Sequence, residues 1–121
     1  MSKHKQTGAK GEQIAVDFLK KQQYEIRYTN WYSGKKEVDI IATLGDLLVF
    51  VEVKTRYDYT FGFPEESVTP QKQQYLKSAA DAFLEEHPTY THLRFDIISI
   101  ILQGDTVKEI KHFEDAFFQV G

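Results

Sequence analysis

Residues 37–54 read EVDIIATLGDLLVFVEVK, and this stretch determines how the rest of the chain is interpreted. Two runs rich in β-branched and aromatic residues, 37–43 and 47–55, flank Gly45-Asp46. Such runs are typical of strands, and a glycine in the first position of a two-residue loop favours a type II′ hairpin turn. With that loop, residue 44 faces residue 47, and the pairing continues outward until residue 37 faces residue 54.

This register sorts the side chains of the hairpin into two faces. One face is uninterrupted and apolar, formed by Val38, Ile40, Ala42, Val49, Val51 and Val53. On the other face Asp39 lies opposite Glu52, and Glu37 lies opposite Lys54. A slip of one residue would move the charged side chains onto the apolar face, so the hydrophobic pattern specifies the register well.

The cross-strand pair Asp39–Glu52 is unusual for a purely structural hairpin. Directly opposite residues have Cβ atoms roughly 4.5–5.5 Å apart, and two carboxylates at about 5 Å repel by roughly 3 kcal/mol at an effective dielectric near 20. A protein relieves such repulsion by sharing a proton or by binding a cation. Because only oxygen ligands are offered, the expected cation is Mg²⁺ or Mn²⁺. Lys54, on the same face, would reach anything bound to that ion.

The segments around the hairpin follow from periodicity and turn residues. Apolar residues at helical spacing predict a helix over 7–23. A second helix is expected from the N-cap pair Thr69-Pro70 to His87. Strands are expected at 24–32, 93–102 and 106–113, the second buried on both faces and the last at an edge. The order α-β-β-β-α-β-β predicts an α/β fold of the α+β type, a mixed sheet with a long crossover helix, in one domain over 1–121.

Two residues outside the hairpin are further site candidates. Glu12 shares a helix face with Gly8 and Ala15 and is a plausible third carboxylate, although a glutamate near a helix start also suits the helix dipole. Lys72 lies on the same helix face as Leu76, near the start of the second helix, and is a candidate site residue there. The alternative is that its aliphatic stem only covers apolar surface.

A possible nucleic-acid contact lies near residue 34. Trp31 and Tyr32 stand beside Lys35-Lys36, so the rings could stack on bases while the lysines contact phosphate. The alternative is that these rings are core aromatics at a strand end. We therefore expect Lys35 and Lys36 to contribute to nucleic-acid binding.

Composition excludes several classes of site. With no cysteine in 121 residues, disulfides, thiolate zinc sites, iron–sulfur clusters and cysteine nucleophiles are excluded. The net charge of −3 is divided unevenly. Up to Pro64 there are ten Lys/Arg and eight Asp/Glu, and after it there are five Lys/Arg and ten Asp/Glu. A polyanion is therefore expected on the N-terminal half. No apolar run approaches the roughly 20 residues that span a bilayer, and no secretory signal is recognisable. We expect a cytoplasmic protein without membrane contact.

Four motifs together carry a family resemblance: GAKGEQIA at 8–15, EVDIIA at 37–42, LVFVEVKTR at 48–56 and RFDI at 94–97. The positions of Asp39, Glu52 and Lys54 resemble the PD-(D/E)xK nuclease superfamily. Nearly the whole chain is similar to the uncharacterised YraN-like family of bacterial proteins. One departure is that the family pattern usually has a glycine just before the glutamate that matches Glu37, where this chain has Lys36.

The resemblance implies a restriction-endonuclease-like αβββαβ core, here with an extra C-terminal edge strand, similar to Holliday junction resolvases. It implies that Glu12, Asp39, Glu52 and the backbone carbonyl of Val53 hold Mg²⁺ or Mn²⁺. It further implies that Lys54 orients the attacking water or stabilises the transition state.

From these likenesses we expect a metal-dependent endonuclease that acts on DNA, on branched or structured substrates. An RNA nuclease is a further alternative, which the sequence does not separate from a DNA nuclease. Arg56 and Lys72 join Lys35 and Lys36 as expected nucleic-acid contacts. A homodimer is expected, with the tail residues Phe117 and Phe118 as a candidate contact. The alternative is a non-catalytic nucleic-acid-binding or protein-interaction module that retains the nuclease fold.

Overall fold

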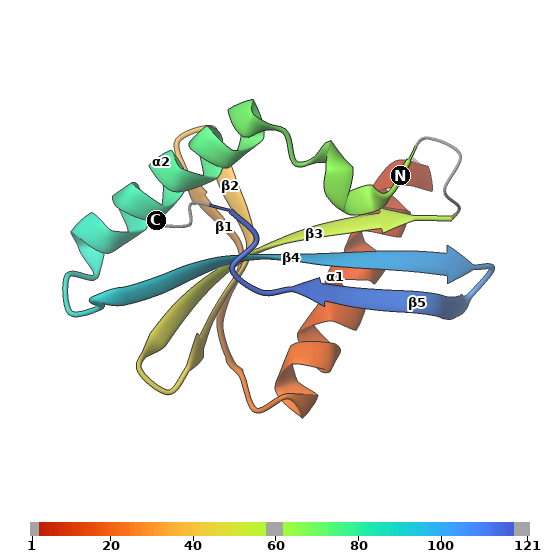
Figure 1. The fold of residues 1–121 in the computed structure, drawn as a ribbon, viewed down its shortest axis with the longest axis horizontal. Coiled ribbons are helices and arrows are strands. Elements are labelled where there is room, and N and C mark those ends of the chain that lie inside the picture. Colours follow the sequence, from red (N-terminus) through yellow and green to blue (C-terminus); the bar gives the residue numbers. More distant parts are fainter. Residues whose placement is uncertain (1–2, 58–61, 118–121) are drawn as a thin grey trace.

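The computed structural model describes residues 3–57 and 62–117, with side chains from residue 8 onward. Its centre is one five-stranded mixed sheet in the order β1-β2-β3-β4-β5 (Figure 1). The strands are β1 (Glu25–Ser33), β2 (Lys36–Leu44), β3 (Leu47–Arg56), β4 (His92–Gln103) and β5 (Thr106–Phe113). Neighbours are antiparallel except β3 and β4, which are parallel. The predicted mixed sheet and the order of its elements are confirmed.

Two helices cover opposite faces of this sheet. Helix α1 (Lys3–Lys21) precedes β1, and helix α2 (Pro70–Glu86) forms the crossover between β3 and β4 after a 3₁₀ turn, η1 (Pro64–Ser67) (Figure 1). The predicted cap of α2 is confirmed, because Thr69 Oγ1 accepts a hydrogen bond from the Lys72 amide at 3.2 Å. Of the described helices, neither is long and apolar enough to cross a membrane.

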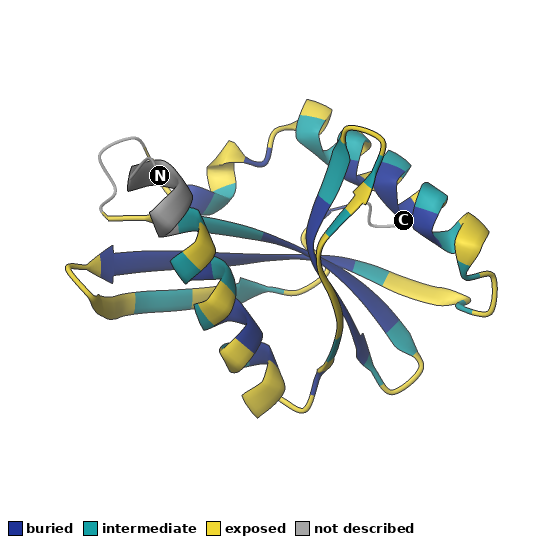
Figure 2. Ribbon diagram, turned by 180° about the vertical axis from the view of Figure 1, so that it is seen from behind, coloured by how far each residue is buried: buried dark blue, intermediate teal, exposed yellow. Residues whose placement is uncertain are grey.

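Each helix covers its own apolar cluster, because alternate residues of β2 and β3 point to opposite faces. Against α1 the buried cluster includes Ala15, Leu19, Ile40, Ala42, Val49 and Val51. Against α2 it includes Ile41, Phe50, Leu76, Ala79, Ala80 and Phe83. The edge strands β1 and β5 carry many exposed residues, whereas β3 and β4 are mostly buried (Figure 2).

The hairpin register is confirmed over its inner part. Described Cα partners run from Leu44↔Leu47 to Ile40↔Val51, and Gly45 in the turn has a φ of +59°. The prediction was wrong for Val38, which packs in the cluster under α2 rather than beside Ile40. The alternation of β2 side chains between the two faces of the sheet changes at Asp39. The neighbouring strand β1 is also irregular, since Asn30 adopts a left-handed φ of 52°.

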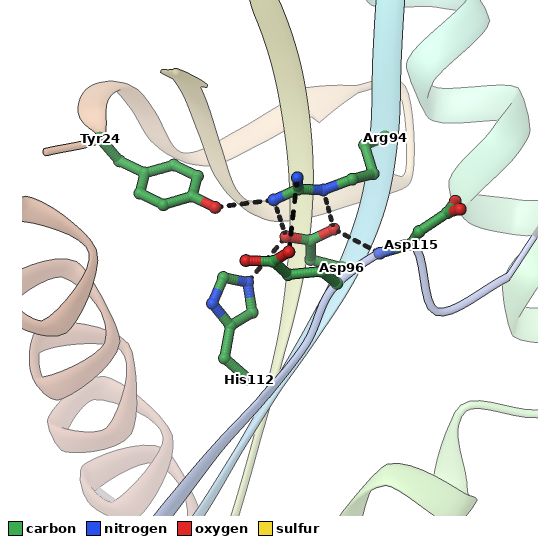
Figure 3. A network of polar contacts seen from close by, with 6 residues as sticks. Tyr24, Arg94, Asp96, His112 and Asp115 are labelled. Atoms are coloured by element: carbon green, nitrogen blue, oxygen red, sulfur yellow. Dashed lines mark hydrogen bonds and ion pairs between the residues drawn. The ribbon is translucent and has the colours of Figure 1, made fainter. Parts of the chain in front are cut away.

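Strand β4 carries a buried polar network that joins it to β5 and to Tyr24, the residue before β1 (Figure 3). Asp96 is fully buried and accepts hydrogen bonds from Arg94 Nε at 2.8 Å and from the Asp115 amide at 3.0 Å. His112 Nε2 lies 2.7 Å from the same carboxylate, and Arg94 also donates to the Tyr24 hydroxyl. Burial alone would raise the pKa of Asp96, but these hydrogen bonds outweigh burial and lower it. Every charge in the network is therefore paired.

The C-terminal tail has a different role from the one predicted. Phe117 is buried in the cluster under α2, with its ring centroid 5.3 Å from that of Phe95, so it is unavailable as a dimer contact. Phe118 lies outside the described residues, as do residues 58–61.

Candidate functional site

The candidate site lies where β2 and β3 separate. The described backbone pairing stops at Ile40↔Val51. One residue further, the side chain of Asp39 takes the place of a backbone partner, since its Oδ2 accepts a hydrogen bond from the Val53 amide at 2.8 Å. Asp39 and Glu52 are therefore not partners in the described ladder, but both line the same cavity, and the charge of Asp39 acts on Glu52. The sequence predicts that the two acids face each other as strand partners; the structure instead brings them to one cavity beyond the end of the described pairing.

Burial favours the protonated form of both acids. Glu52 is 5% exposed and Asp39 is 9% exposed. Burial, reinforced by the negative charge of Asp39, raises the pKa of Glu52 to about 8, and burial also raises the pKa of Asp39. At neutral pH the pair therefore retains one proton, because two buried carboxylates in contact resist double ionisation. This is one of the two outcomes that the sequence argument anticipated for such a pair.

Two lysines stand near Glu52 without satisfying it. Lys54 Nζ is 3.7 Å from Oε1, and Lys72 Nζ is 3.9 Å from Oε2, both beyond hydrogen-bond distance. Oε2 is buried and finds no hydrogen-bond partner among the described residues. A buried carboxylate oxygen without a donor is costly, so this atom suits a cation supplied from outside the chain.

Helix α1 brings the third predicted acid to the same pocket. Glu12 lines a cavity of about 260 Å³ together with Asp39, Glu52, Lys54 and Arg56. Burial raises the pKa of Glu12, although a hydrogen bond from the Asn30 side chain opposes that rise.

Sequence reasoning missed Asn30. The only signal was its residue type, because asparagine tolerates the left-handed φ that Asn30 adopts on β1. That conformation accompanies a side-chain contact with Glu12 and so links the edge strand to the pocket.

Helix α1 can reach this position because it approaches β3 closely. A Cβ atom on Gly11 would lie 1.8 Å from Thr55 Oγ1, so only glycine fits there without displacement. Glu12 is the next residue along the helix and Lys54 precedes Thr55 on the strand. The close approach therefore sets the spacing of the pocket walls.

The carboxylates are not gathered into a complete metal cage. Within residues 3–57 and 62–117, no three Asp, Glu or His side chains converge closely enough to hold an ion by themselves. Mg²⁺, however, usually keeps several waters and is held by one or two carboxylates plus substrate phosphate. Asp39 and Glu52 are enough carboxylates for that smaller requirement, and metal ligation by Asp39, Glu52, Glu12 and the Val53 carbonyl stays a prediction.

The turn between β1 and β2 is docked on α2. Tyr75 accepts a hydrogen bond from the Glu37 amide at 2.7 Å and donates one to the Lys35 carbonyl at 3.0 Å. Lys36 Nζ donates to Ser78 Oγ. Lys36 therefore already has a partner within the fold, whereas the side chain of Lys35 is exposed.

The remaining predicted nucleic-acid contacts differ in whether they lie at the site. Arg56 lines the pocket and Lys72 reaches Glu52, so both converge on the site. Trp31 packs on Phe83 with ring centroids 5.3 Å apart and belongs to the core, which confirms the alternative interpretation for that ring. Tyr32 is 61% exposed and is not a core residue.

Comparison with known proteins agrees with the motifs. Residues 11–100 match the profile of "Uncharacterised protein family UPF0102". A UPF0102 protein of Flavobacterium psychrophilum is 42% identical over 98% of each chain, and one of Christiangramia forsetii is 43% identical over the same shares. A UPF0102 protein of Caldicellulosiruptor bescii is 44% identical over 93% of this chain and 98% of its own.

Proposed function

The chain belongs to the uncharacterised protein family UPF0102, as its YraN-like motifs indicated, and we propose that it is a metal-dependent endonuclease. It hydrolyses phosphodiester bonds of DNA, with branched or otherwise structured DNA as the substrate. The observation that carries the proposal is the buried pair Asp39–Glu52. One oxygen of Glu52, Oε2, has no hydrogen-bond partner among the described residues, and each oxygen of its carboxylate has a lysine within 4 Å.

The residues present fit Mg²⁺ or Mn²⁺. The donors are carboxylate oxygens, which hard divalent cations prefer. Asp39 and Glu52 would hold the ion, with Glu12 on the facing wall of the same cavity. The ion would displace the shared proton and remove the repulsion that keeps the pKa of Glu52 high. When bound, such an ion polarises a phosphate oxygen and lowers the pKa of a bound water.

The lysines supply the positive charge that a phosphodiester needs. Lys54 is partly buried, with 23% of its side chain exposed, and lies next to Glu52 on the cavity wall. From there its ammonium group stabilises the negative charge that develops on the phosphate during hydrolysis. Lys72, held over the Tyr75 ring at 4.3 Å, and Arg56 orient the phosphate from neighbouring elements.

Cleavage of a substrate panel tests this function. Labelled duplex, flap, single-stranded and four-way-junction DNA, with matching RNA, are incubated with the protein and Mn²⁺ or Mg²⁺. We expect metal-dependent cleavage of at least one DNA substrate, and loss of activity by at least about 100-fold in Lys54→Ala, since such charge stabilisation is worth that much. Lys108→Ala is the matched control, because Lys108 is an exposed lysine on β5, and it retains wild-type activity.

The contrary outcomes are distinct. Metal-dependent cleavage that survives in Lys54→Ala would assign the activity to a contaminant or another surface. DNA binding without cleavage of any substrate, in either metal, would favour the alternative of a non-catalytic binding module. Cleavage confined to the RNA substrates would replace DNA as the substrate class.

A further inference from the structure

We propose that Tyr32 is a base-stacking platform at the edge of this site, so that the site selects a nucleic-acid strand with unpaired bases. The inference rests on the proposed function for the place where the phosphate lies, and it adds what occupies the neighbouring surface.

Tyr32 is positioned toward the site by the alternation of β1. Its neighbour Trp31 faces α2 and packs on Phe83. The Tyr32 side chain therefore points to the opposite face, which α1 covers. There a hydrogen bond from its hydroxyl to Glu37 raises the pKa of Tyr32, and the charges of Glu12 and Asp39 contribute. The ring is therefore close to the carboxylates of the candidate site.

The ring of Tyr32 is open to solvent. Tyr32 is 61% exposed, and no other described aromatic ring packs on it. Tyr28, on the same strand, is exposed to 41%, but its ring packs edge-on against Phe83 and His87. Tyr32 thus offers a free aromatic face, which is what stacks on a nucleobase.

The charge around the site divides the ligand into two parts. The charges that act on Tyr32 are acidic, those of Glu37, Glu12 and Asp39, and without a metal they repel phosphate. Positive charge comes from Lys54 and Arg56 on β3, which line the cavity, and from Lys72 on α2, which reaches Glu52. A nucleotide satisfies both groups of charges when its phosphate lies toward the lysines and its neutral base lies on the tyrosine.

This arrangement requires an unpaired base. In a duplex both faces of an internal base are covered by its neighbours, and an exposed ring on the protein cannot displace them without an unstacking cost. Single-stranded segments, flaps and the open arms of a branched substrate present free faces. Because every base has such a face, the preference is for strand state rather than sequence.

Binding without catalysis tests the inference. Fluorescence anisotropy at low salt in EDTA measures the affinity for a labelled 12-nucleotide dT strand, a 12-nucleotide rU strand and a 12-base-pair duplex. Tyr32→Ala is expected to weaken single-strand binding at least about fivefold and leave duplex binding within about twofold. Tyr32→Phe keeps the ring and stays within about twofold of wild type. Tyr28→Ala is the matched control on the same strand and also stays within about twofold.

Each result bears on the inference. Equal single-strand affinity of wild type and Tyr32→Ala overturns it, as does an equal loss for the duplex or the absence of single-strand binding in wild type. A loss in Tyr32→Phe equal to that in Tyr32→Ala would assign the effect to the hydroxyl and overturn stacking. Binding of dT or of rU alone identifies DNA or RNA as the strand. Failure of the nuclease proposal is read separately, as the absence of metal-dependent cleavage while this binding persists.

Discussion

Glu52 shows how the fold gives an acidic side chain properties that it lacks in water. The β3 segment LVFVEVK buries it between apolar neighbours, and Asp39 adds a second negative charge. Both effects disfavour ionisation, so the pKa of Glu52 rises to about 8. The nearby lysines oppose this rise without cancelling it, because neither forms a hydrogen bond to the carboxylate.

That Asp39 and Glu52 lie near each other could be predicted, because the register of the inner hairpin brings these two positions to the same end of the paired segment. The bond from the Val53 amide to Asp39 could not, because it depends on where the two strands separate. Asn30 was out of reach for the same reason. A hydrophobic pattern specifies which face a side chain occupies, but not where a backbone leaves regular geometry to make a polar contact.

Asp39→Asn tests the metal site by stability alone. An asparagine oxygen can still accept from the Val53 amide, and the repulsion with Glu52 disappears. The metal-free variant should therefore be as stable as wild type, or more stable by on the order of 1 kcal/mol. Mn²⁺ at about 100 times its dissociation constant should stabilise wild type by roughly 2.7 kcal/mol, and the variant by much less. Thermal melts with and without Mn²⁺ measure both effects.

Asp46→Asn provides the matched control for that experiment. It makes the same change of charge in the exposed turn of the same hairpin, and should retain the full response to Mn²⁺. If Asp39→Asn instead destabilises the protein and Mn²⁺ shifts neither melt, Asp39 is a structural carboxylate.

At the level of elements, the hairpin and both helices were predictable, and the close packing of α1 on β3 was predictable only in outline. In the sequence, Gly8, Gly11 and Ala15 fall on one flank of the predicted first helix, where small residues let a neighbouring element approach closely. The structure identifies that neighbour as Thr55. Of the two glycines only Gly11 must be a glycine, since a Cβ on Gly8 would meet no atom within 4 Å.

Gly11→Ala should therefore separate α1 from β3. Its new methyl group would lie 1.8 Å from Thr55 Oγ1, and the helix must move to relieve the overlap. We expect a loss of about 1–3 kcal/mol in the free energy of unfolding, measured by urea denaturation, with weaker Mn²⁺ binding because Glu12 moves too. Gly8→Ala, in the same helix, should be neutral or stabilise by up to ~1 kcal/mol through helix propensity. Equal effects of the two changes would contradict a specific contact at Gly11.

For the whole molecule, one sheet holds two buried polar groups that differ in whether their charges are paired. The network around Asp96 is fully paired and ties β5 and Tyr24 to β4, whereas the Asp39–Glu52 pair is left short of positive charge. The sequence analysis singled out Asp39 and Glu52 and gave Asp96 no role beyond its place in the RFDI motif. What separates the two groups is their partners. Those of Asp96 include His112 on β5 and the Asp115 amide after it, with Tyr24 before β1 bound through Arg94, whereas Glu52 is approached from α2 by Lys72. Strand patterns alone do not align those elements.

The two groups predict opposite responses of stability to pH. The pKa of Asp96 is lowered by folding, so its contribution is present above the unfolded pKa near 3.8 and is lost only in stronger acid. The pKa of Glu52 is raised from 4.5 to about 8, so the folded protein holds a proton that the unfolded chain has released across that interval. Stability therefore falls as pH rises from 4.5 toward 8, and the raised pKa values of Asp39 and Glu12 act in the same direction.

Urea denaturation of the metal-free protein between pH 5 and pH 8 measures this effect. Wild type should lose on the order of 2 kcal/mol across the range. Glu52→Gln cannot ionise at this position and should lose much less, which separates the contribution of Glu52 from that of every other group. Parallel decline of the two proteins would show that Glu52 does not hold the extra proton, and the buried pair would then already be ionised without a metal. A nearly flat Glu52→Gln curve that converges with wild type at low pH is the expected result, because at pH 5 the protonated Glu52 carries the same charge as glutamine.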